Sequence, residues 1–306
     1  MFTFKWLASL VLAATVIPTL TAETHCPGNV ASLPLRLVNH YQIVVPVIIN
    51  HAGPYDFLLD TGTDTTIIGP SLAAELHLGT QGSAMISGAG LSETARFAQL
   101  DLLEAGAHEV ANQEVLVYGL MNLRSLDSRI RGILGEDFLT HFDMLIDNGN
   151  KLLCLDDSGS MRAEVNGPHI PLSATERKPD GGPSPRMLIL SARLSDGSQP
   201  ARLKLDSGTN APFLYNTNGP VAPGGYRRGL VVGSGADGDQ KVFSALPPQE
   251  VKIGSIRLHN VTFMALAHPQ KNSGRRVFDG LLSTDLFRRV FINHVDHYAV
   301  LEPWQD

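Results

Sequence analysis

Short apolar runs separated by Gly, Asn, Asp and Pro set the pattern of this chain. Apolar, often β-branched runs between such breakers are typical of β-strands. Two segments carry helix-start features instead, and we expect short helices at Pro70–Leu76 and Glu136–Phe142. The pattern therefore predicts an all-β protein with a few short helices. The expected strands are Ile43–Ile49, Phe57–Leu59, Val115–Tyr118, Met144–Ile146, Leu152–Leu155, Leu188–Leu194, Arg202–Leu205, Gly229–Val232, Val251–Ile253 and Phe291–Ile292.

The second half of the pattern repeats the first. Tyr55–Thr63 recurs as Ala201–Thr209, 146 residues later, and Gly132–Leu139 recurs as Gly280–Phe287, 148 residues later. Strand segments before and after these matches align in the same order, with only small gaps. One such match could arise by chance, but several in one order indicate two copies of the same fold.

The repeat predicts the domain organisation. We expect an N-terminal lobe over residues 23–157 and a C-terminal lobe over residues 158–306. Residues 170–186 of the second lobe are expected to be partly an inserted loop, because they contain a Pro- and Gly-rich stretch at 178–185.

The first 22 residues have the features of a secretory signal peptide. Lys5 precedes an apolar run from Trp6 to Leu20, and Ala22 supplies a small residue for cleavage. The run is shorter than the ~18–20 residues that span a bilayer, so cleavage is favoured over a membrane anchor. We therefore expect a secreted or periplasmic protein with no stable membrane span.

Composition narrows the function classes. The chain has 306 residues and a formal net charge of −6, and so lacks the basic field that nucleic-acid binding requires. We expect no metal and no cofactor, since the two cysteines show no metal-type spacing with histidine. Cys26 and Cys154 could form one disulfide in an oxidising compartment or remain two unpaired thiols.

The duplicated acid carries the candidate chemistry. Asp60 and Asp206 each end an apolar strand and are followed by a hydroxyl residue and then Gly. Two copies related by a pseudo-two-fold axis would bring these side chains face to face. Carboxylates about 3 Å apart cannot both ionise easily, so the pair would share one proton. One member could then act as a base on water while the other protonates a carbonyl oxygen.

With these motifs the sequence resembles the retropepsin-like aspartic proteases, as a single-chain fusion of two such lobes in a pepsin-like bilobal arrangement. The resemblance implies two pseudo-two-fold-related β-barrel lobes and an aspartic endopeptidase acting, as a monomer, on peptide or protein substrates. It assigns Asp60 and Asp206 as the catalytic pair. The active-site loops would be Thr61, Gly62 and Thr63 in one lobe, and Ser207, Gly208 and Thr209 in the other.

The resemblance also implies two flaps that close over an extended peptide. Carried over by position, they would lie at Gly88, Ala89 and Gly90, and at Gly233, Ser234 and Gly235. Two departures stand out. Ser283 replaces the Gly135 of the first copy, so we expect that turn to differ, and residues 210–212 (Asn-Ala-Pro) replace residues 64–66 (Asp-Thr-Thr).

Simpler interpretations stay open. An Asp before Gly is most often a turn residue that binds its own backbone. A non-catalytic peptide-binding or scaffold protein on the same fold is the alternative function, motivated by the altered second loop. His294, Asp296 and His297 fall around a turn near the C-terminus, where we expect solvated residues and not a metal site.

Overall fold

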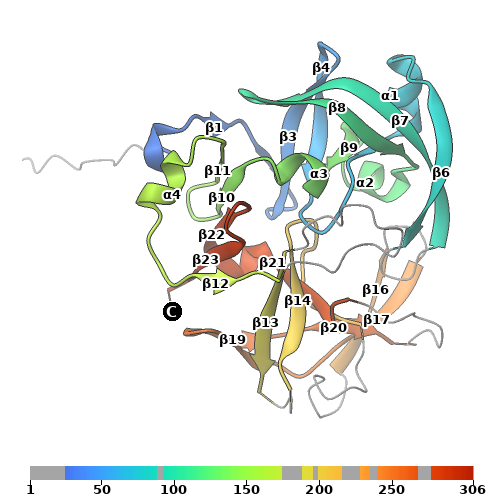
Figure 1. Ribbon diagram of the computed structural model, residues 1–306. Helices are drawn as coiled ribbons and strands as arrows, with labels where there is room; N and C mark the ends of the chain where they lie inside the picture. Colours follow the sequence, from blue (N-terminus) through green and yellow to red (C-terminus); the bar gives the residue numbers. More distant parts are fainter. Residues whose placement is uncertain are drawn as a thin grey trace, which may run out of the picture.

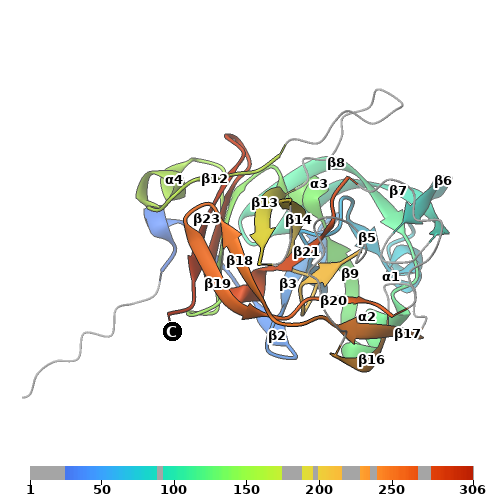
Figure 2. The same ribbon diagram turned by 90° about the horizontal axis from the view of Figure 1, so that it is seen from below.

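The computed structural model describes residues 25–87, 92–173, 188–195, 199–215, 228–234, 240–267 and 277–305. These residues form two β-sheet lobes and a third sheet to which both halves of the chain contribute (Figures 1 and 2). The expected all-β architecture with few short helices is confirmed. None of the helices in the described part of the chain has the length and hydropathy that a membrane crossing requires.

The first lobe is a closed, eight-stranded sheet. β3 pairs with β4 on one side and with β7 on the other, so the sheet curls round on itself. Helices α1 (Pro70–Glu75), α2 (Met121–Leu126) and α3 (Glu136–Leu139) lie in its connections. In spatial order its strands are β2 (Arg36–Val38), β3 (Gln42–Ile49), β4 (Ala52–Leu59), β9 (Ile130–Leu134), β5 (Ile67–Ile68), β8 (His108–Val117), β7 (Ser92–Ala105) and β6 (Thr80–Ser87).

The second lobe repeats this topology in a more broken form. Val47 of β3 pairs with the end of β7, and its counterpart Arg193 of β13 pairs with β18. The place of the single strand β7 is thus taken by two strands, β17 and β18. In spatial order the strands are β16 (Arg228–Ser234), β17 (Gln240–Ala245), β20 (Met264–Leu266), β15 (Phe213–Leu214), β21 (Gly280–Ser283), β14 (Ala201–Asp206), β13 (Ile189–Leu194), β18 (Gln249–Ile253) and β19 (Ile256–Val261).

In the third sheet, equivalent residues of the two copies occupy equivalent positions. At its centre Leu145 pairs with Phe291, its own counterpart in the second copy. At its edges Leu33 pairs with Leu153, and Ile170 pairs with Ala299, which is the counterpart of Leu153. Its strands, in spatial order, are β1 (Ser32–Leu33), β11 (Leu152–Asp156), β10 (Asp143–Asp147), β22 (Phe287–Asn293), β23 (Tyr298–Pro303) and β12 (Ile170–Pro171).

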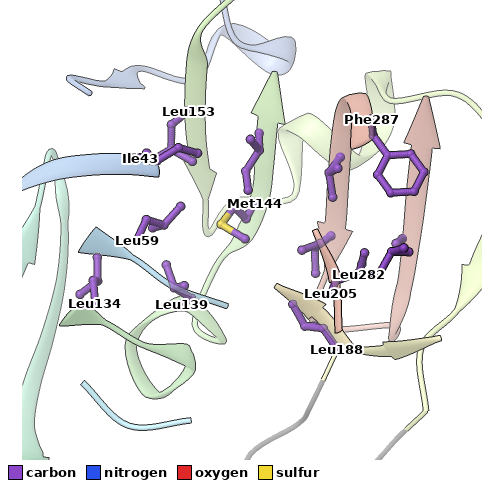
Figure 3. Close-up of a cluster of buried hydrophobic side chains, with 14 of the residues drawn as sticks. Ile43, Leu59, Leu134, Leu139, Met144, Leu153, Leu188, Leu205, Leu282 and Phe287 are labelled. Atoms are coloured by element: carbon purple, nitrogen blue, oxygen red, sulfur yellow. The ribbon is translucent and has the colours of Figure 1, made fainter. Parts of the chain in front are cut away.

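One apolar core runs through both lobes and the third sheet. Leu59 and Leu205, the residues just before the two acids, are completely buried in it. Figure 3 shows Leu59 grouped with Leu139 and Met144, and Leu205 grouped with Leu188 and Leu282. Because both strand ends are embedded in close-packed apolar surroundings, the residues that follow them have little freedom to move.

The segment that joins the two halves contains a short helix. Within it lies helix α4 (Ser160–Glu164), which Asp156 supports by accepting a hydrogen bond from the Met161 amide at 2.7 Å. A 3-10 turn, η1 (Pro27–Asn29), packs against this helix. Cys26 and Cys154 form a disulfide with Cα atoms 5.9 Å apart, so the first of the two cysteine alternatives holds.

Candidate active site

Equivalent strand ends carry the two acids. Asp60 follows the last residue of β4, and its amide donates to the Leu134 carbonyl of the parallel strand β9 at 3.0 Å. Asp206 is the last residue of β14 and pairs with Ser283 of the parallel strand β21. Both acids therefore sit where a central strand leaves its sheet, beside a neighbour that runs in the same direction.

Two hydroxyl residues lock the loops together. The Thr61 amide donates to Ser207 Oγ at 3.1 Å, and the Ser207 amide donates to Thr61 Oγ1 at 3.0 Å. Each hydroxyl in turn donates across the interface, Thr61 to the Leu205 carbonyl at 3.0 Å and Ser207 to the Leu59 carbonyl at 2.9 Å. A hydroxyl is needed at both positions because only a group that accepts and donates together makes both bonds.

Two glycines contact both carboxyl groups. The Gly62 amide donates to Asp60 Oδ1 at 2.7 Å, and the Gly208 amide donates to Asp206 Oδ1 at 2.8 Å. A Cβ atom on Gly62 would lie 2.5 Å from Cγ of Asp206, and one on Gly208 would lie 2.5 Å from Cγ of Asp60. Each carboxyl thus binds the glycine of its own loop and touches the glycine of the other. The loops that carry Asp60 and Asp206 therefore pack directly against each other.

The two acids differ in their remaining partners. Thr63 Oγ1 donates to Asp60 Oδ2 at 2.7 Å. Its counterpart Thr209 donates its hydroxyl to the Ala211 carbonyl instead, at 3.0 Å, and offers only its amide to Asp206, at 3.1 Å. The replaced residues 210–212 thereby change the hydrogen bonding of the second acid.

The electrostatic surroundings of Asp206 shift its pKa strongly. Burial, and then the negative charge of Asp60, raise the pKa of Asp206 to about 7. The positive charge of Lys204 and the amide donors of Gly208 and Thr209 act in the opposite direction. Asp206 therefore retains its proton in mildly acidic solution.

The expected difference at Ser283 is visible. The Ser283 hydroxyl donates to the Thr209 carbonyl at 2.8 Å. At Gly135 a Cβ atom would lie 2.9 Å from backbone atoms of Thr65 and Thr66, so the first loop has no space for a side chain there. The first copy continues into helix α3, whereas the second continues into the 3-10 turn η2 (Thr284–Leu286).

Sequence reasoning missed a buried lysine beside the acids. Lys204 is 2% exposed, and its Nζ donates to the Gly62 carbonyl at 2.8 Å and to Asp64 at 2.7 Å. The available indication was a lysine between Leu203 and Leu205, at a position where the first copy has Leu58.

One turn prediction is wrong. His294 does lie between β22 and β23, but it is 2% exposed and not solvated. It donates to the Phe142 carbonyl at 2.6 Å and faces the buried carboxylate of Glu136, with Nε2 3.4 Å from Oε2. Burial opposes a charge on His294, but the ion pair with Glu136 raises its pKa. No group of three or more potential metal ligands occurs among the described residues.

The expected flap positions are described only in part. Gly88, Ala89, Gly90 and Gly235 lie outside the described residues. Gly233 and Ser234 end β16, which pairs with β17 in antiparallel register. The corresponding strands of the first lobe, β6 and β7, are also antiparallel partners.

One family model and several solved structures match this chain. The family model for aspartyl protease matches residues 45–138, which include Asp60 and its loop. No curated protein matches the chain. Among solved structures, a retropepsin-like aspartic protease from Rickettsia conorii is 18% identical, over 41% of this chain and 90% of that chain, with a TM-score of 0.32.

Two longer structures also match. An aspartic proteinase from Irpex lacteus is 13% identical, over 89% of this chain and 97% of that chain, with a TM-score of 0.49. Conglutin gamma, a basic 7S globulin from lupine seeds, is 9% identical, over 89% and 94% of the two chains, with a TM-score of 0.48. The family match places residues 45–138 in the aspartyl protease family, and the resemblance of the chain to the retropepsin-like aspartic proteases is confirmed.

Proposed function

We propose that this protein is an aspartic endopeptidase that hydrolyses peptide bonds in extended peptides or unfolded segments, with Asp60 and Asp206 as its catalytic pair. The observation that carries the proposal is the crossed packing of the acids. Each carboxyl contacts the glycine of the opposite loop, with no room there for a Cβ atom. A turn acid that only caps its own backbone would not need the partner loop in this position.

The asymmetry of the pair supports a division of roles. In the proposed mechanism Asp60 accepts a proton from a water molecule, whose oxygen bonds to the peptide carbonyl carbon. Asp206 gives its proton to the carbonyl oxygen, which forms a neutral tetrahedral diol. The C–N bond then breaks as the nitrogen takes the proton from Asp60, and Asp206 recovers a proton from a diol hydroxyl. No covalent enzyme intermediate is required.

The proposed substrate is an extended chain. The antiparallel pairs β6–β7 and β16–β17 are the strands that lead to the expected flap positions. Flaps of this kind would bind a peptide backbone by strand-like pairing, with side-chain pockets adding selectivity. Because one chain supplies both acids, we also propose that the active form is a monomer, which size-exclusion chromatography coupled to light scattering tests.

We propose further that the protein is exported. Residues 1–22 motivate this, and the Cys26–Cys154 disulfide supports it, since such bonds persist in oxidising compartments. Comparing the processed N-terminus and the thiol content of protein from cell extracts and from extracytoplasmic fractions tests the proposal.

The decisive test of the activity is peptide cleavage by two isosteric variants. Asp60→Asn and Asp206→Asn should each lower kcat/KM for a cleaved library peptide by at least about 10²-fold, because each removes a proton-transfer group. Asp101→Asn, at an exposed position on β7, is the matched control and should retain wild-type activity. Full activity in either dyad variant would refute the proposal.

Binding of a transition-state mimic distinguishes the endopeptidase from the alternative, a non-catalytic peptide-binding protein. The wild type should bind a pepstatin-like peptide and cleave members of a peptide library between about pH 4 and pH 7. Tight binding of the mimic without cleavage of any peptide would favour a non-catalytic peptide-binding protein.

A further inference from the structure

We propose that Lys204 is a positioning residue of the dyad, which holds the first active-site loop from the second lobe and thereby makes the two acids unequal. The proposal rests on the proposed function, because it concerns how the same site is set up. The repeat does not require a lysine at this position, since the equivalent residue of the first lobe is Leu58.

The side chain of Lys204 is buried, and its ammonium group contacts two residues of the first loop. Its side chain is 2% exposed, and its Nζ lies 2.7 Å from Asp64 Oδ1 and 2.8 Å from the Gly62 oxygen. The ring of Phe278 lies on a further side, 5.9 Å from Nζ. Burying an ammonium group is unfavourable unless it is paired. The buried position of Leu58 shows that an equivalent strand accepts an apolar residue there.

The peptide group that Lys204 holds is central to the site. Lys204 binds the carbonyl of Gly62, a residue whose amide donates to Asp60 and which packs against the carboxyl of Asp206. The next residue, Thr63, provides the second hydrogen bond to Asp60. A shift of this peptide would therefore change both donors to Asp60 and the spacing of the two acids.

The second loop has no equivalent clamp among the described residues. The position equivalent to Asp64 is Asn210, which is exposed. Thr209 turns its hydroxyl away from Asp206 towards the Ala211 carbonyl. The loop held by Lys204 is thus the one whose acid accepts two hydrogen bonds on different oxygens, as a proton acceptor should.

The charge of Lys204 also acts on Asp206. The charged groups that interact with Lys204 are Asp64, Asp206 and Glu136, and Glu136 is in turn paired with His294. Lys204 opposes the rise in the pKa of Asp206 that burial and Asp60 cause. Without this charge Asp206 would retain its proton to higher pH. The alkaline limit of activity, where the general acid is lost, would then move upward.

The repeat itself supplies the test variant. Lys204→Leu combined with Asp64→Asn installs the residues that the equivalent positions, 58 and 210, already hold. This symmetrised variant removes the ion pair without leaving a buried charge unpaired. We expect its unfolding midpoint in urea to stay near the wild-type value, and its kcat to fall about tenfold or more with little change in KM. Asp101→Asn, at an exposed position on β7, is the control and should retain wild-type activity.

A titration distinguishes positioning from a merely structural role. The ¹³C carboxyl resonance of Asp206 should titrate at higher pH in the symmetrised variant than in the wild type, and the alkaline limb of kcat/KM should move with it. A folded symmetrised variant with wild-type kcat and an unmoved Asp206 titration would overturn the proposal. If the variant does not fold, Lys204→Met is measured in the same way.

The same titration separates this proposal from the proposed function. It needs no turnover, so a wild-type protein that cleaves no peptide would refute the endopeptidase while the NMR result still decides the part played by Lys204. An upward movement of the Asp206 titration would support the inference, and an unchanged titration would contradict it.

Discussion

The two active-site loops share one backbone plan but differ in their side-chain partners. In both, an acid ends a buried strand, a hydroxyl residue crosses to the other lobe, and a glycine packs against the opposite carboxyl. Loop 60–66 adds a second hydrogen bond to its acid and a clamp from Lys204. Among the described residues, loop 206–212 has no such side-chain bond to its acid and no such clamp, and its acid has a raised pKa. The features that the two loops share position the two acids. The features in which the loops differ give each acid different surroundings and, in our proposal, a different role.

The first prediction concerns the two glycines, a feature that both loops share, and the expected loss of activity is large. Gly62→Ala and Gly208→Ala would each place a methyl group 2.5 Å from the opposing carboxyl carbon. Because both clashes are equal, each variant should lose at least about 10²-fold in kcat/KM through displacement of the acids. Gly79→Ala is the control, since nothing lies within 4 Å of a Cβ atom there. A fully active variant at position 62 or 208 would show that the carboxyls are not packed across the loops.

The second prediction concerns a feature in which the loops differ, the raised pKa of Asp206, and its effect on the free energy of unfolding. The pKa of Asp206 in the folded state, about 7, lies above its unfolded value of 3.8. Its contribution to the free energy of unfolding is therefore complete below about pH 4 and is lost as the pH rises to about 7, by on the order of 4 kcal/mol. Urea unfolding of the wild type and of Asp206→Asn across this range should show a steeper loss in the wild type. Parallel curves would mean that Asp206 titrates normally.

The smallest effect tests the interlocking hydroxyls. Thr61→Val and Ser207→Ala each remove two buried hydrogen bonds and leave an amide and a carbonyl of the partner loop unsatisfied. Each should lower the free energy of unfolding by about 2–3 kcal/mol, as measured in urea. Ser71→Ala, on the exposed face of α1, should change it by less than about 0.5 kcal/mol. A much smaller loss at one of the two positions would show that the two hydroxyls do not contribute equally to stability.

The repeated segments explain why much of this site is predictable. Tyr55–Thr63 and Ala201–Thr209 share the apolar alternation and the acid, hydroxyl and glycine positions. A buried strand end and a tight turn follow from local sequence, and the duplication adds the long-range contact between them. The helix expected over Glu136–Phe142 is present but ends at Leu139, because helix ends depend on the packing of the following residues.

The unpredicted features depend on contacts between distant segments. Lys204 pairs with a residue 140 positions away, and His294 is buried against Glu136 of the other half of the chain. A lysine in a strand or a histidine in a turn is ordinarily solvated, so only the three-dimensional arrangement reveals these buried pairs. Helix α4 escapes prediction for a related reason, since its start is supported by Asp156 at the end of β11.

The proposed pairing of the two acids is tested most directly by titrating Asp206 in the presence and absence of Asp60. We predict that the ¹³C carboxyl resonance of Asp206 titrates near pH 7 in the wild type. In Asp60→Asn the value should fall, because the neighbouring negative charge is gone, but stay above 3.8 because the side chain remains buried. An Asp206 that titrates near 3.8 in the wild type, and does not respond to the loss of Asp60, would contradict this pairing.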